Sequence, residues 1–280
     1  MWNAMANTSM SLSFQDVGGT RTRVLEAGVG QPLVLLHGIG GHLEAYMHNV
    51  PVLSQHFRVI AYDMPGHGYS DGSVEDQELL DYTDHLAALL DLLDLDAVSL
   101  NGESLGGWVS MKFAHAHPDR TRQIVLNTPG GTEARPEVMQ RLRMLSQQAA
   151  DEPTAERIRT RLEWLMADNA TVTDELVEAR RQIYSQSHFA ESMRHIMCLQ
   201  DPAVRRRNMV TDEELRAIRC PALVVWTSND PSGPAAQGMH IADTIPGGRF
   251  HFIDKAGHWP QWEQTEEFNK VVVSFLEEPE

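Results

Sequence analysis

The sequence predicts an α/β fold in which helices flank a mostly parallel β-sheet and a helical cap is inserted into the sheet domain. Short apolar runs alternate with longer segments whose apolar residues recur three and four positions apart, as expected for buried strands and amphipathic helices. The 280 residues, 42% of them hydrophobic, suffice for one large core and an insertion. The strand pattern disappears after residue 128 and returns after residue 211. We therefore expect a core domain at residues 1–128 and 212–280, with a cap at 129–211.

The expected elements follow one another in a regular order. Runs that predict strands are TRTRVLEAG, PLVLLHG, FRVIAYD, AVSLN, RQIVLN, ALVVWT and RFHFID. The first of them follows a Gly18-Gly19 turn and belongs to an early hairpin. Helical spacing occurs between the strands at residues 42–55, 78–95 and 104–118, and within the cap at 137–150, 156–166 and 174–186. Because helices separate most of the strands, these strands are expected to run parallel.

Composition restricts the classes of partner. The formal net charge is −16, and the acidic residues are spread through helical segments, so nucleic acid and membrane surfaces are not expected to bind. The expected partner is a small-molecule substrate, and self-association into a homo-oligomer is left open. Cys198 and Cys220 are too few for a disulfide framework or a zinc cluster, and the sequence shows neither a signal-peptide pattern nor an apolar run of about 18 residues. These features predict a cytoplasmic protein without a metal.

A G-x-S-x-G motif, Gly102 to Gly106, places Ser104 where an apolar strand meets a helix. The motif alone is common by chance, so the stronger evidence is its position between a strand and a helix. Glycines on both sides permit a sharp turn that holds the serine hydroxyl at the carboxyl edge of the sheet. The alternative is a serine that only caps the helix. The context predicts that Ser104 is a catalytic nucleophile.

A serine nucleophile needs a histidine base and a carboxylate that orients the histidine. Asp230 follows the expected strand ALVVWT, and His258 lies in the loop after the last expected strand. The order serine, aspartate, histidine is the one that accompanies this type of turn. Asp254 is the alternative acid, but it falls at the end of a strand. Ser104, Asp230 and His258 are therefore the predicted catalytic residues.

Backbone donors for a developing oxyanion are expected near these residues. The HGIGG segment offers N–H groups at Ile39 and Gly40, and Leu105 offers the N–H at the start of its helix. Neither G-x-x-x-x-G-K-S/T nor G-x-G-x-x-G occurs, so no nucleotide cofactor is predicted. Glu103 is expected to diverge from the neighbouring serine as a solvated or salt-bridged acid.

Five ordered segments, HGIGG, YDMPGHGYSD, GESLGG, TSNDPSGP and AGHWPQWEQTEEFN, resemble those of the α/β-hydrolase family over nearly the whole chain. The last segment is most similar to the meta-cleavage product hydrolases, which cut a carbon–carbon bond in ring-fission products of aromatic degradation. The resemblance implies a serine-dependent hydrolase of a 2-hydroxy-6-oxo-dienoate that needs no cofactor. It also implies that Arg180, in the segment ELVEAR, binds the substrate carboxylate and that Trp259 contacts the substrate.

Two departures from that subfamily keep other functions open. Its members usually carry an asparagine immediately before the serine, where this chain has Glu103, and a further asparagine near the place of Ala45. A carboxylesterase or lactonase is the first alternative, and a cofactor-free dioxygenase or a non-enzymatic binding protein of the same fold is the second. An exposed helix arginine is the alternative for Arg180. Candidates for an apolar lining in the cap, unless they form plain core, are Trp164, Tyr184, Met193 and Met197.

Overall fold

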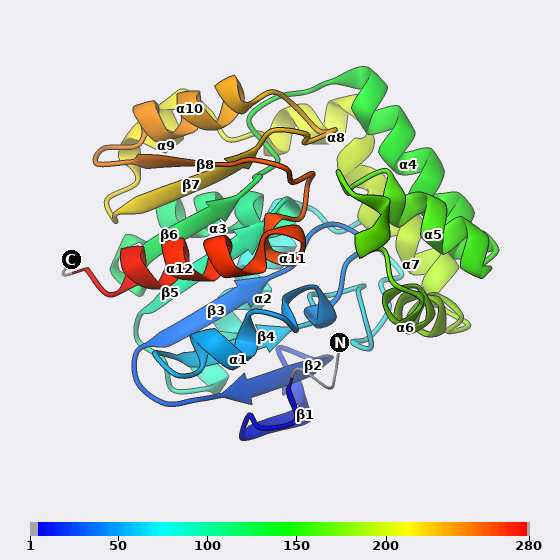
Figure 1. Cartoon of the computed structure of the whole chain (residues 1–280), viewed down its shortest axis with the longest axis horizontal. Coiled ribbons are helices and arrows are strands. Elements are labelled where there is room, and N and C mark those ends of the chain that lie inside the picture. Colours follow the sequence, from blue (N-terminus) through cyan, green and yellow to red (C-terminus); the bar gives the residue numbers. More distant parts are fainter. Residues whose placement is uncertain (1–4, 279–280) are drawn as a thin grey trace.

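The computed structural model describes residues 5–278, which contain one eight-stranded sheet (Figure 1). The strand order is β1-β2-β4-β3-β5-β6-β7-β8. β2 pairs antiparallel with β1 and with β4, and all other neighbours are parallel. The bounds are β1 Met10–Val17, β2 Thr20–Ala27, β3 Pro32–Leu36, β4 Arg58–Tyr62, β5 Val98–Glu103, β6 Thr121–Asn127, β7 Ala222–Thr227 and β8 Arg249–Ile253. The expected mostly parallel sheet is confirmed.

The parallel register gathers the loops of the site at one edge of the sheet. Leu36 at the end of β3 pairs with Gly102, and Glu103 at the end of β5 pairs with Asn127. β5 and β7 are buried at every residue, as their continuous apolar runs predict, whereas the edge strand β1 is largely exposed. The loops after β3, β5, β7 and β8 therefore leave the same edge of a rigid, buried sheet.

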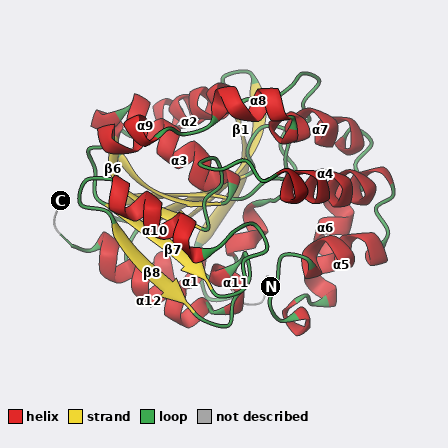
Figure 2. Cartoon of the chain, turned by 90° about the horizontal axis from the view of Figure 1, so that it is seen from above, coloured by secondary structure: helices red, strands yellow, loops and turns green. Residues whose placement is uncertain are grey.

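Helices cover both faces of the sheet (Figures 1 and 2). α1 (Val50–Leu53) and α12 (Thr265–Leu276) lie together on one face, and α2 (Leu79–Leu92) and α3 (Leu105–Ala116) lie on the other. α10 (Ala235–Thr244) packs against β7 and β8. The other short helices of the core are η2 Leu43–Tyr46, η3 Pro118–Arg120, α9 Asp212–Ala217 and α11 Pro260–Glu263.

One expected helix is shorter in the structure than its spacing suggests. Residues 42–55 form only the 3₁₀ turn η2 and the single turn α1. Pro51 explains the break, because it has no N–H group with which to continue a helix from η2. No helix within residues 5–278 has the length and apolar character needed to cross a membrane.

The helices from α4 to α8, which lie between β6 and α9 in the chain, gather at one end of the sheet (Figures 1 and 2), and we call them the cap. Their bounds are α4 Pro136–Asp151, α5 Ala155–Glu163, η4 Asn169–Thr171, α6 Asp174–Tyr184, α7 Phe189–Ile196, η5 Met197–Gln200 and α8 Pro202–Asn208. Hydrogen bonds attach the cap to the core. Trp108 Nε1 donates to the carbonyl of Asn208, and the Ser73 N–H donates to Ser192 Oγ. These bonds hold the cap over the edge where the loops of the site lie.

Candidate active site

Ser104 occupies a strained turn between β5 and α3. Its φ of 53° and ψ of −107° are unusual for a residue with a side chain, and such strain costs on the order of 1–3 kcal/mol. A Cβ at Gly102 would lie 2.2 Å from the carbonyl oxygen of Gly106, and a Cβ at Gly106 would lie 2.1 Å from that of Leu36. Strand and helix thus pack too closely for any other residue at these positions. This close packing explains the G-x-S-x-G motif physically.

His258 lies in the loop after β8 and is hydrogen-bonded to Asp230 in the loop after β7. Nδ1 of the histidine is 2.9 Å from Oδ1 of the aspartate, whose side chain is fully buried. Burial lowers the pKa of His258, but Asp230 and Glu103 outweigh burial, so the pKa is raised above its ordinary value. Asp254 instead lies exposed directly after β8. The structure thus places Asp230, and not Asp254, against the histidine.

Glu103 is a member of the site that the sequence did not reveal. Its side chain is 1% exposed, and Oε1 lies 3.3 Å from Nε2 of His258. Burial raises the pKa of this carboxyl group, and neither of its oxygens makes a regular hydrogen bond. Of the two expectations for Glu103, a solvated acid is wrong, because the carboxyl packs against Gly38, where a Cβ would lie 2.3 Å from Oε2, whereas a salt-bridged acid agrees with the contact to His258. Glu103 therefore contacts the imidazole nitrogen on the side opposite Asp230.

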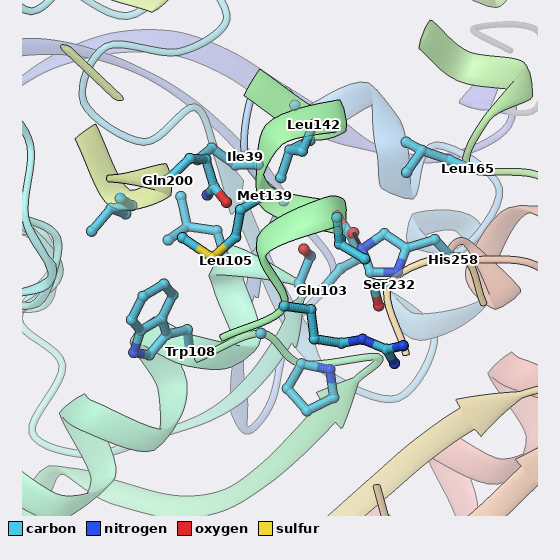
Figure 3. A pocket seen from close by; sticks show the side chains of 18 of the residues that line it. Ile39, Glu103, Leu105, Trp108, Met139, Leu142, Leu165, Gln200, Ser232 and His258 are labelled. Carbon is cyan, nitrogen blue, oxygen red and sulfur yellow. Dashed lines mark ion pairs between the residues drawn. The ribbon is translucent and has the colours of Figure 1, made fainter. Parts of the chain in front are cut away.

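A cavity between the sheet edge and the cap joins these groups (Figure 3). Ser104, Glu103 and His258 line it from the core. Of the expected oxyanion donors, Ile39 and Leu105 line the cavity, and the N–H of Leu105 belongs to the first turn of α3, where no helical carbonyl pairs with it.

Gly40, the remaining expected donor, is not among the residues that line the cavity. The loop turns at this residue, with a φ of 67°, and the Gly40 carbonyl accepts a hydrogen bond of 2.7 Å from Tyr184 Oη. Gly40 therefore contacts the cap through its carbonyl, and Gly38, Ile39 and Gly41 are the residues of this loop that line the cavity. The role of the Gly40 N–H as an oxyanion donor stays a prediction.

The apolar lining of the cavity also differs in part from expectation. Trp164 lines the cavity as expected, whereas Tyr184 on α6, Met193 on α7 and Met197 on η5 are buried but are not among the residues that line it. Beside Trp164 and the arginines described below, the cap residues that line the cavity include Val138, Met139, Leu142, Leu165, Leu199 and Gln200. Most of this surface is apolar, so a polar group within it has a large effect on which ligand fits.

Arg180 on α6 lines the cavity and is 1% exposed. Its Nε donates to His42 Nε2 at 3.3 Å, and its NH2 has no hydrogen-bond partner. Trp259 also lines the cavity, and its ring lies 5.2 Å from the guanidinium carbon of Arg180. The alternative that Arg180 is an exposed helix arginine is wrong. The exposed arginine of this helix is the next residue, Arg181, which pairs with Glu178 at the surface.

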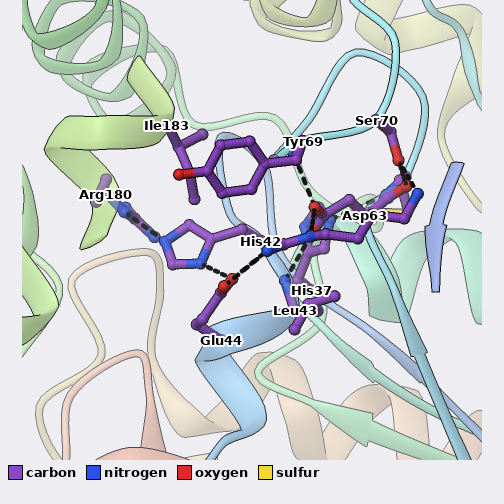
Figure 4. Close-up of polar contacts among 12 residues, drawn as sticks. His37, His42, Leu43, Glu44, Asp63, Tyr69, Ser70, Arg180 and Ile183 are labelled. Carbon is purple, nitrogen blue, oxygen red and sulfur yellow. Dashed lines mark hydrogen bonds and ion pairs between the residues drawn. The ribbon is translucent and has the colours of Figure 1, made fainter. Parts of the chain in front are cut away.

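A buried polar network fixes the position of Arg180 (Figure 4). His42 Nδ1 is 2.8 Å from Glu44, and Glu44 receives two hydrogen bonds from Arg23, whose Nε also donates to Asp63. Burial lowers the pKa of His42, so its neutral ring donates through Nδ1 to Glu44 and accepts from Arg180 through Nε2. The network links β2 to the cap and orients the Arg180 side chain.

Arg161 on α5 is a cavity residue that sequence reasoning missed. It is 2% exposed, its Nε donates to Ser146 Oγ at 3.0 Å, and its NH1 has no hydrogen-bond partner. The signal was present in the sequence: Ile158, Arg161 and Leu162 recur at helical spacing on one face of α5. Their spacing places the arginine on the buried face.

Within residues 5–278, no cluster of His, Cys, Asp and Glu side chains is arranged to hold a metal ion.

Comparison with known proteins assigns the family. A model of the alpha/beta hydrolase fold matches residues 31–265. The chain belongs to this family. It is 30% identical to the 2-hydroxy-6-oxo-6-phenylhexa-2,4-dienoate hydrolase of Comamonas testosteroni, with 96% of both chains covered. It is 31% identical to a 2-hydroxy-6-oxononadienedioate/2-hydroxy-6-oxononatrienedioate hydrolase of Paraburkholderia phymatum, with 92% of both covered.

A solved structure agrees with this assignment. A variant of the meta-cleavage product hydrolase from Pseudomonas fluorescens IP01 superimposes with a TM-score of 0.84 and 26% identity, over 94% of this chain and 97% of that one. The expected hydrolase family and the similarity to meta-cleavage product hydrolases are confirmed.

Proposed function

We propose that the protein hydrolyses the carbon–carbon bond between C5 and C6 of a 2-hydroxy-6-oxo-dienoate. The observation that carries this proposal is Arg180, a buried guanidinium with an open N–H group in the same cavity as Ser104 and His258. An unpaired buried cation is costly, and a substrate carboxylate offsets that cost with a charge-assisted hydrogen bond. Relatives whose names specify such dienoates cover nearly the whole chain.

The reaction needs an electron sink, because a carbanion is a poor leaving group. Ketonisation of the dienol moves a proton from the 2-hydroxyl group to C5 and leaves a carbonyl group at C2. When C5–C6 then breaks, its electron pair passes along the conjugated chain to the C2 oxygen, so the leaving fragment departs as a dienolate. Arg180 binds the adjacent carboxylate and so holds this fragment in place.

The serine completes the reaction in two steps. His258 accepts the Ser104 proton as Oγ bonds to C6, and Asp230 stabilises the imidazolium that forms. Ile39 and Leu105 lie where backbone N–H groups can donate to the developing oxyanion. His258 returns the proton to the dienolate as it leaves. Water then hydrolyses the acyl-serine, and the net products are 2-hydroxypenta-2,4-dienoate and a carboxylic acid.

The direct test mixes the purified protein with a yellow dienoate and follows its absorbance together with both products. We expect bleaching with equal release of the two acids. Arg180→Met should lower kcat/KM on the order of 10- to 100-fold, the effect of losing a charge-assisted hydrogen bond. Arg181→Met, which alters the exposed neighbour, should leave kcat/KM unchanged. Rapid cleavage of neutral esters, no bleaching and indifference to Arg180→Met would together establish the carboxylesterase or lactonase alternative.

A cytoplasmic location is also proposed. It is supported by the cysteine content, since two cysteines, Cys198 and Cys220, are too few for the disulfide framework of an exported protein. Fractionation of the source cells with an antibody tests this location, and recovery outside the cytoplasmic fraction would contradict it.

A further inference from the structure

The cavity contains two buried arginines with open N–H groups, but the C1 carboxylate of the proposed substrate would bind only one of them, Arg180. Arg161 is 2% exposed and Arg180 is 1% exposed, and NH1 of the first and NH2 of the second lack hydrogen-bond partners. Arg135 and Arg205 also line the cavity, but they have partners: Arg135 pairs with Glu137, and Arg205 donates twice to the Glu133 carbonyl. Among these cavity arginines, the buried N–H groups without a partner are therefore those of Arg161 and Arg180.

No anionic side chain among the described residues hydrogen-bonds to Arg161. Its polar contact is the hydroxyl of Ser146, and the ring of Trp164 lies 5.3 Å from its guanidinium carbon. Glu103 is a buried acid of the cavity, but its oxygens bond to neither arginine, and one of them contacts His258. Burial lowers the pKa of Arg161 to about 10; the charge of Arg180 lowers it further, and the charges of Tyr184 and Glu103 oppose the shift without cancelling it. Arg161 is thus still a cation at neutral pH, at a cost that an external anion can offset.

The two arginines are held at separate places. Arg180 extends from α6 and is fixed by His42, in the loop after β3, whereas Arg161 extends from α5 and is fixed by Ser146 on α4. The two guanidinium groups are therefore positioned by different helices and different hydrogen-bond partners. Each offers its own open N–H group to negative charge in the cavity that contains Ser104.

We propose that Arg161 binds a second carboxylate of the substrate, so that the preferred substrate is a dianionic dienoate whose C6 substituent ends in a carboxylate. This inference rests on the proposed function for the placement of the first carboxylate on Arg180. The remaining lining near α4 is apolar and suits the carbon chain between the two charged ends, as the cavity positions of Met139 and Leu142 show (Figure 3).

The test compares two matched dienoates, one with a propyl group and one with a 2-carboxyethyl group at C6. The wild-type protein should favour the dianion in kcat/KM, and Arg161→Met should reduce the ratio of the two kcat/KM values on the order of 10- to 100-fold. Arg161→Lys should retain part of the ratio. Arg157→Met is the matched control, because Arg157 lies on the same helix but pairs with Glu152 at the surface, and it should leave the ratio unchanged.

A binding measurement separates this inference from the proposed function. Calorimetry with Ser104→Ala protein should show tighter binding of pentanedioate than of pentanoate, and Arg161→Met added to Ser104→Ala should remove the difference. If neither dienoate is bleached but the diacid advantage depends on Arg161, the C–C hydrolase proposal fails and the second anion site stands. A wild-type preference for the propyl substrate, or a ratio that Arg161→Met leaves unchanged, would overturn the inference. So would equal binding of the two acids.

Discussion

The sheet edge and the cap contribute different kinds of residue to one cavity. Ser104 is fixed by backbone geometry, between glycines that permit no other residue, and His258 is fixed by a buried carboxylate. The cap arginines, Arg161 and Arg180, are each held by one side-chain hydrogen bond at their Nε. In the function that we propose, the residues of the sheet edge attack the bond, and the cap arginines select the charges of the substrate. Mutations in the two regions should therefore have different kinetic signatures.

The largest effect is expected at the sheet edge. Ser104→Ala removes the nucleophile, so kcat should fall on the order of 10⁴- to 10⁶-fold, as for other serine nucleophiles. Initial rates with a saturating dienoate measure the loss. Circular dichroism should show that the variant folds normally, because the new side chain is smaller than the serine. A variant that keeps a rate within about tenfold of wild type would show that Ser104 is not the nucleophile.

The next largest effect concerns the acid. Asp230→Asn should reduce kcat on the order of 10³- to 10⁴-fold, because the amide cannot stabilise the imidazolium of His258. Asp254→Asn is the control, since Asp254 is exposed and directly follows β8. Its rate should stay near that of wild type. The reverse ranking of the two variants would assign the orienting carboxylate to Asp254.

The contrast between the sheet edge and the cap also explains how much of the fold and of the site could be predicted from the sequence. The strands and Ser104 were predictable because continuous apolar runs and a glycine-bounded serine directly reflect close packing. Asp230 and His258 followed from their order along the chain after strands. The burial of Glu103 was not predicted, since no motif accompanies it and its carboxyl packs against Gly38, which is far away in the sequence. Arg161 was missed although its spacing with Ile158 and Leu162 indicates the buried face of α5, because that pattern does not show that the face lines a cavity.

Glu103 should affect the pH dependence more than the maximal rate. The charges of Asp230 and Glu103 raise the pKa of His258, and only the neutral imidazole can accept the serine proton. Glu103→Gln removes one of these charges, so the acidic limb of the kcat/KM profile should move to lower pH. Glu103→Asp keeps the charge and serves as the comparison. A limb that stays in place, or moves to higher pH, would contradict the electrostatic contact between Glu103 and His258.

The smallest effect is expected where the cap contacts the loop after β3, at Gly40. Tyr184→Phe removes the hydrogen bond to the Gly40 carbonyl and should lower the free energy of unfolding by about 1 kcal/mol, with a small loss in kcat/KM. Urea titration and steady-state kinetics measure the two effects. Tyr82→Phe is a matched control, because Tyr82 is also buried but its hydroxyl has no hydrogen-bond partner. Equal destabilisation by the two changes would show that the Tyr184 contact does not stabilise the loop.

The central claim is that a nucleophile on the sheet edge and an arginine on the cap act on opposite ends of one substrate. The most direct measurement is a crystal structure of Ser104→Ala protein with a bound dienoate. We expect the C1 carboxylate within hydrogen-bond distance of Arg180 NH2 and the C6 carbonyl carbon beside residue 104, with its oxygen directed at the backbone of Ile39 and Leu105. A dienoate whose carboxylate lies away from Arg180, or whose C6 lies away from residue 104, would contradict the claim.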